Sequence, residues 1–131
     1  MMTKQQALTE QFTRAVANLR EVLEKFKNQQ TDKAVYRDSA IQRFEIAFDL
    51  SWKALREKLR AEFGVDATSP KKAFQEGFKQ GILANDPLWL DLIETRNLTT
   101  HAYSEAFAEK TVLQLPQALV IFEKLLWKLT N

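Results

Sequence analysis

The sequence has no cysteine, a single histidine, and few of the residues that break helices. Without cysteine the chain has no disulfide, no thiolate metal ligand and no thiol nucleophile. Only three glycines and three prolines occur in 131 residues, whereas a β-rich domain of this size needs many turns. The longest unbroken apolar run, residues 118–122, is too short to span a bilayer. These absences predict a helical protein without a membrane span.

The composition is that of an ordinary globular domain. Hydrophobic residues make up 45% of the chain and charged residues 27%, and a single domain over residues 1–131 is expected at this length. The N-terminus lacks the apolar core of a signal peptide, which with the absence of cysteine predicts a cytoplasmic location. The net charge of +2 neither demands nor forbids a nucleic-acid partner.

Apolar residues recur in steps of three and four along most of the chain, the period of amphipathic helices. The pattern predicts long helices over about residues 4–28, 36–63 and 105–129. Ser69-Pro70 and Asp86-Pro87 combine a capping side chain with a proline suited to the first helical position, and each is expected to start a further helix. The sequence therefore predicts an all-α fold, an antiparallel up-and-down bundle of four long helices plus one short helix.

Three residues mark expected interruptions. Gly64 follows the end of an apolar pattern, where a left-handed cap residue is favoured, and Gly81 is expected to stop the short helix that Ser69-Pro70 opens. Pro116 falls inside the last predicted helix, and its missing N–H is expected to kink or restart that helix. Trp52, Trp89 and Trp127 lie on or beside apolar stripes and are expected in the core or in an interface between subunits.

The chemically able side chains gather in residues 94–103, which contain the lone histidine. On a continuous helix Asn97 and His101 share a face, so Asn97 can orient the imidazole, while Arg96 and Tyr103 share the adjacent face. Arg96 and His101 are separated by about 140° around the axis. The two side chains converge on one substrate only if the helix ends near Thr100 or a second copy completes the site. The alternative is that His101 has a structural role, which is the more frequent role of a single histidine in a chain.

The chemistry that suits these groups is RNA cleavage by internal attack of a 2′-hydroxyl. A neutral His101 can accept the hydroxyl proton, and Arg96 can stabilise the charge that grows on the phosphate, without a metal. One histidine cannot be base and acid in the same step, so the pattern favours a homodimer that supplies two. Neither a closed metal-ligand set nor a glycine-rich phosphate loop is present, and no metal or cofactor is expected.

The motif Arg96-Asn97-x-x-x-His101-x-Tyr103 resembles the R-N-x-x-x-H-x-Y motif of the HEPN superfamily of helical domains. Residues 36–53, YRDSAIQRFEIAFDLSWK, resemble the second helix of one branch of that superfamily, the nucleotidyltransferase substrate-binding proteins. The resemblance covers roughly residues 10–128. It implies a HEPN-like helical bundle that forms a homodimer and works with a minimal nucleotidyltransferase encoded nearby.

Two functions follow from this resemblance, and the sequence leaves both open. In the first, the protein is a toxin–antitoxin component with metal-independent endoribonuclease activity: Arg96 and His101 are catalytic, Asn97 supports them, and Tyr103 accepts AMP from the partner, which blocks RNA. In the second, the protein is a non-catalytic subunit that completes the transferase active site, and Arg96 and Tyr103 hold a nucleotide.

A polar edge on the predicted second helix offers candidate supporting residues. Arg43 and Glu45 belong to this edge, which also contains Arg37 and Asp49 and by itself is typical of a solvated face. The resemblance makes Arg43 and Glu45 candidates for an interface or for support of the site.

Arg96 is expected to be partly buried, because apolar residues flank it in the sequence. A partly buried arginine needs a partner of opposite charge. The candidate partners are Glu94, Glu105 and a ligand phosphate.

Overall fold

In the computed structural model, which describes residues 1–101 and 104–131 and only the backbone of His101, the fold is helical. Its helices are α1 (Lys4–Asn28), α2 (Lys33–Phe63), α3 (Pro70–Lys79), α4 (Leu88–His101) and α5 (Glu105–Thr130), and these described residues form no strand. The predicted all-α class is confirmed. None of these helices, within the residues described, is apolar over a length that could cross a bilayer.

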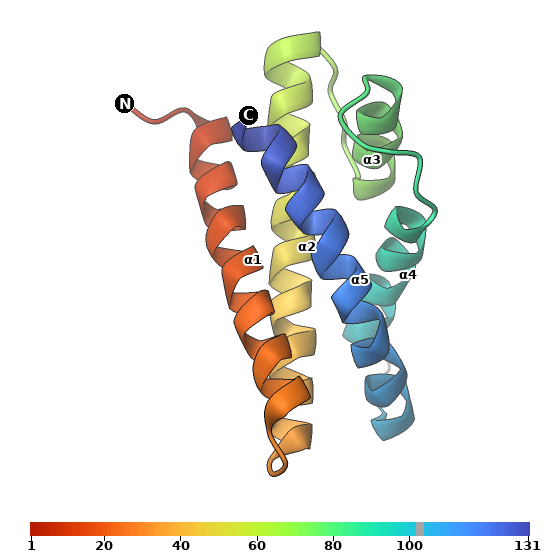
Figure 1. The fold of residues 1–131 in the computed structure, drawn as a ribbon. Coiled ribbons are helices and arrows are strands. Elements are labelled where there is room, and N and C mark those ends of the chain that lie inside the picture. The colour runs from red at the N-terminus through yellow and green to blue at the C-terminus, as the bar shows by residue number, and fades with distance from the viewer. Residues whose placement is uncertain (102–103) are drawn as a thin grey trace.

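The long helices α1, α2 and α5 pack against one another, and α3 and α4 lie on one side of them (Figure 1). The chain descends in α1, ascends in α2, descends in α4 and ascends again in α5, so both termini lie at the same end (Figure 1). The order is the up-and-down one that was predicted. The fourth helix, α4, has 14 residues, from Leu88 to His101. It is about half as long as α1, which has 25 residues.

Aromatic rings from all five helices meet in the core. The ring centroids of Phe74 and Trp89 lie 4.5 Å apart, and Trp89 lies 5.9 Å from Phe122 of α5. Phe122 in turn contacts Phe12 of α1 and Phe44 of α2, at 6.0 and 6.2 Å. Burial of such a side chain stabilises the fold by about 1.5–3 kcal/mol, so this cluster fixes α3 and α4 against the long helices.

The helix ends follow the local signals in the sequence. The Ser69 hydroxyl accepts a hydrogen bond from the backbone N–H of Lys72, and Pro70 opens α3. Asp86 Oδ1 accepts a hydrogen bond from the backbone N–H of Leu88 at 2.9 Å, at the start of α4. Gly64 has the left-handed conformation that was predicted, with φ +66°, and Gly81, just after α3, has φ +77°.

Two expectations need correction. Helix α2 begins at Lys33, three residues before its predicted start, after Asp32 in the left-handed conformation. Pro116 does not restart the last helix, because α5 runs from Glu105 to Thr130. The buried neighbours Val112 and Leu115 hold this part of α5 in the core, and their burial offsets the one missing hydrogen bond.

Candidate functional site

The Arg96 side chain extends from α4 to α2 and binds two carboxylates there. Its Nε and Nη2 atoms donate to the two oxygens of Asp49, both at 3.2 Å, and Nη1 donates to Glu45 Oε2 at 2.7 Å. Glu45 and Asp49 are four residues apart, so they lie on one face of α2. This forked arrangement fixes both the position and the plane of the guanidinium.

Two threonines of α4 complete this group, which we call the Arg96 cluster: Glu45, Asp49, Arg96, Thr99 and Thr100. Arg96 Nη1 also donates to Thr100 Oγ1 at 3.1 Å, and the Thr99 hydroxyl donates to Glu45 Oε2 at 3.0 Å. Glu45 therefore accepts from a guanidinium and a hydroxyl at once. The cluster ties the last turn of α4 to the middle of α2.

The Arg96 cluster is partly open to solvent and carries more negative than positive charge. The side chain of Arg96 is 25% exposed. The hydrogen bonds to Asp49 raise the pKa of Arg96 above its ordinary value, an effect that burial reduces and the charges of Asp49 and Glu45 reinforce. One N–H of Nη2 is not used by these contacts. Arg96 can donate a hydrogen bond from this N–H to a ligand while it keeps its ion pairs with Glu45 and Asp49.

The protein partners expected for Arg96 were wrong. Glu94 is exposed on α4, and Glu105 binds Arg37 at the start of α5. The observed partners, Glu45 and Asp49, are 51 and 47 residues away in the chain. Only the packing of α4 against α2 brings them within reach. Glu45, expected as a supporting residue on other grounds, does lie in the cluster.

The remaining motif residues are described in part. Asn97 is exposed, on the turn before His101, and α4 ends at His101. The described part of α4 reaches His101, one residue beyond Thr100. Tyr103 lies outside the described residues, as does the side chain of His101. The roles predicted for Asn97, His101 and Tyr103 stay predictions.

Arg43 faces a different neighbour. Its guanidinium contacts the Ser39 hydroxyl at 3.3 Å and the backbone carbonyl of Asn18 in α1 at 3.4 Å. Arg43 and Glu45 are two residues apart, about 200° around α2, so they point to different sides of that helix. The structure therefore brings Glu45 to Arg96 but does not bring Arg43 there.

Sequence reasoning missed Arg37, which was assigned to a solvated edge. Its side chain is 3% exposed and donates to Glu105 at 2.8 Å, to Glu109 at 2.7 Å and to Asp38 at 2.9 Å. These hydrogen bonds, the one to Glu105 first, raise its pKa far above the ordinary arginine value. A signal was available, because Arg37 lies four residues before Ile41 and so continues the apolar stripe of α2.

Residues 8–131 match the family described as nucleotidyltransferase substrate binding protein like. The chain belongs to this family.

Two solved structures are similar to this chain. The structure of a Thermus thermophilus protein superposes on it with a TM-score of 0.82 and 33% sequence identity, and the match covers 92% of this chain and 99% of the Thermus chain. A Haemophilus influenzae protein has a TM-score of 0.83 and 22% identity, covering 94% of this chain and 99% of its own; its structure is described as revealing the fold of a substrate binding domain of a nucleotidyltransferase. At 22% identity the second comparison shows the fold alone.

A curated protein is also similar to this family member. It is a probable ribonuclease HepT of Haemophilus influenzae, 27% identical over 85 residues, which are 62% of this chain and 58% of the relative. The match therefore spans less than two thirds of that relative's length. Within residues 1–101 and 104–131 of the family member, no group of three or more acidic or histidine side chains could hold a metal ion.

Proposed function

We propose that this chain is the partner subunit of a minimal nucleotidyltransferase, part of a toxin–antitoxin pair, and that it carries a metal-independent endoribonuclease site at the end of α4. The observation that carries this proposal is the position of Arg96, fixed by Glu45 and Asp49 one turn before the end of the helix at His101. A fixed, solvent-reachable guanidinium five residues before a lone histidine in the chain is suited to phosphate chemistry. The name of the HepT relative supports the same reading.

In the proposed reaction, His101 removes the proton from an RNA 2′-hydroxyl. The 2′-oxygen then attacks the neighbouring phosphorus, the bond from phosphorus to the 5′-oxygen breaks, and a cyclic phosphate forms. The 5′-oxygen needs a proton, which the His101 imidazolium of a second copy supplies in a homodimer. The unused N–H of Arg96 Nη2 stabilises the charge that grows on the phosphate oxygens.

Tyr103 is the proposed point of control. Its hydroxyl is two residues from His101 in the chain, so AMP added there by the transferase would bring bulk and negative charge to the RNA site. Both effects oppose the binding of a polyanion. Asn97 is proposed to orient the His101 imidazole from the preceding turn.

The test is RNA cleavage by the isolated protein in the presence of a metal chelator. We expect cleavage products that end in a cyclic phosphate, and a loss of about 10²- to 10⁴-fold in rate for His101→Ala. Arg20→Ala is the matched control, because Arg20 forms an exposed ion pair with Glu123 away from α4. Equal cleavage by the wild type and His101→Ala, or no cleavage by either, contradicts the ribonuclease proposal.

One observation favours the second function, a non-catalytic subunit that completes the transferase site. Arg96 is already paired with two carboxylates, so the isolated chain offers a net negative cluster rather than a free cation. On this reading ATP binds only when the transferase is present. Calorimetry of the isolated protein and of the complex, each titrated with ATP, distinguishes the two: strong ATP binding by the isolated protein contradicts it.

A further inference from the structure

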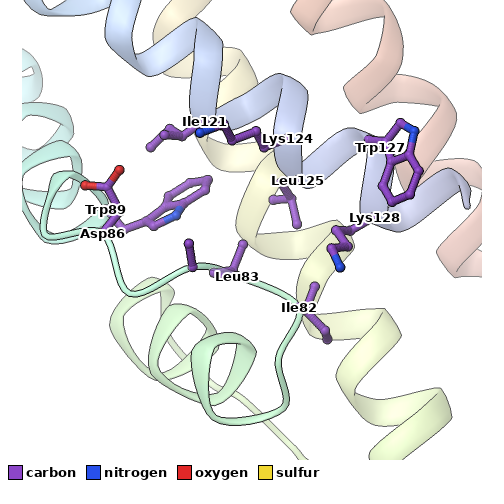
Figure 2. Close-up of a pocket in the computed structure, with 10 residues that line it drawn as sticks. Ile82, Leu83, Asp86, Trp89, Ile121, Lys124, Leu125, Trp127 and Lys128 are labelled. Atoms are coloured by element: carbon purple, nitrogen blue, oxygen red, sulfur yellow. The ribbon is translucent and has the colours of Figure 1, made fainter.

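A hollow lies near the start of α4, at the opposite end of this helix from the Arg96 cluster. It has a volume of about 290 Å³ and is formed by the loop between α3 and α4, the start of α4 and the C-terminal half of α5. Figure 2 shows Trp89 reaching into the space between the loop that carries Leu83 and the part of α5 that carries Leu125. Trp89 precedes Arg96 by seven residues, about 10 Å along the helix axis, so the two regions can be studied separately.

The walls of this hollow are apolar and recessed. Leu125 is 1% exposed, Trp89 5% and Leu83 7%. The aromatic lining residue that solvent reaches most is Trp127, which is 61% exposed at the rim. The volume is at the lower limit of typical ligand pockets, which points to a ligand smaller than a nucleotide.

The polar groups at the opening are hydrogen-bond donors and cations. Lys124 and Lys128 come from α5, one turn apart, and among the residues that the structure describes no carboxylate lies within salt-bridge distance of either. Lys128 Nζ lies 5.9 Å from the Trp127 ring centroid. Asp86, a carboxylate in the lining, accepts a hydrogen bond from the backbone N–H of Leu88. An anionic head group is complementary to this rim.

We propose that this hollow binds a small amphipathic carboxylate, with its apolar body against Trp89 and Leu125 and its carboxylate beside Lys124 and Lys128. Burial of the apolar body provides most of the binding free energy. The two lysines select the sign of the charge, because a ligand cation would meet two like charges and a neutral ligand would gain no ion pair.

The experiment uses the full chain and three probes of one apolar length: octanoate, octanol and octylamine. The indole N–H signals of the three tryptophans are followed by NMR, after assignment with Trp127→Phe and Trp52→Phe. We expect octanoate to give a saturable shift of the Trp89 signal without moving that of Trp52, and to bind about fivefold more tightly than octanol. Octylamine is expected to bind more weakly than octanol.

The double variant Lys124→Gln with Lys128→Gln tests the head-group assignment. It should remove the preference for octanoate while leaving the affinity for octanol unchanged, and Lys110→Gln, an exposed lysine elsewhere on α5, should change neither. The absence of a saturable Trp89 shift overturns the proposal. Equal binding of the three probes, a preference for octanoate that survives in the double variant, or a Trp89 shift produced by the transferase but not by octanoate overturns it as well.

Discussion

Two arginine clusters join α2 to its neighbours, and they use similar groups in different surroundings. Arg37 of α2 binds Glu105 and Glu109 of α5, whereas Arg96 of α4 binds Glu45 and Asp49 of α2. On α2, Arg37, Glu45 and Asp49 are spaced by eight and four residues, so they spread over about 120° around the helix. Neighbouring faces of α2 therefore hold the last turn of α4 and the first turns of α5.

The difference between the clusters is solvent access to the guanidinium. Arg37 is 3% exposed, and its carboxylate partners cover it while being themselves 49–83% exposed. Arg96 is 25% exposed. A covered guanidinium with three carboxylates can only hold helices together, whereas an open one with an unused N–H can also meet a phosphate. The comparison favours a structural role for Arg37 and supports the proposal that Arg96 meets a phosphate.

Among the effects that separate the two clusters, the largest expected one is the loss of RNA cleavage in the Arg96→Ala variant. Removal of one donor to the reacting phosphate should lower the rate by about 10²- to 10³-fold, while stability falls less than it does for Arg37→Met. The measurement is single-turnover RNA cleavage in chelator together with urea unfolding. A loss of cleavage that is matched by Arg37→Met at the same folded fraction would erase the distinction between the two clusters.

The next effect is on stability and concerns Arg37. Arg37→Met keeps much of the buried side-chain volume but removes the charged hydrogen bonds, and should lower the free energy of unfolding by about 2 kcal/mol. Arg20→Met is the matched control, because Arg20 binds Glu123 at the same 2.8 Å but is 48% exposed; it should cost less than about 1 kcal/mol. If chemical denaturation gives equal losses of unfolding free energy for Arg37→Met and Arg20→Met, burial does not strengthen the ion pairs of Arg37.

A smaller effect concerns the charge of the Arg96 cluster. Asp49→Asn removes one of two carboxylates and should raise the affinity of the site for a ligand phosphate by about two- to fivefold. AMP binding, measured by calorimetry, is the test, and Asp66→Asn, which changes an exposed carboxylate near the end of α2, is the control. A fall in affinity for Asp49→Asn would show that orientation of Arg96 outweighs charge.

The smallest effect concerns pH. Because the folded protein raises the pKa of Arg37, its contribution to stability is fully present below the ordinary arginine pKa and is lost only as pH rises beyond the folded value. The stability difference between wild type and Arg37→Met should therefore be constant from about pH 6 to about pH 9. Urea unfolding at several pH values checks this, and a difference that shrinks within that range contradicts it.

Most of the fold was predictable because its signals are local. The period of apolar residues gave the helices, and Ser69-Pro70 and Asp86-Pro87 marked two helix starts where the structure has them. The errors arose where local and tertiary forces differ. Pro116 costs a hydrogen bond because it stands in the interior of α5, but the burial of its neighbours keeps α5 continuous.

The candidate site divides in the same way. The sequence by itself determined the helices, the caps at Ser69, Asp86 and Gly64, and the grouping of Arg96, Asn97 and His101 within six residues, because these depend on spacing within a short stretch. Only the tertiary structure decided that Arg96 meets Glu45 and Asp49, and that Arg37 is buried beneath Glu105 and Glu109. The physical reason is that an ion pair between helices depends on how those helices pack, and charges alone do not specify which of several carboxylates comes within reach.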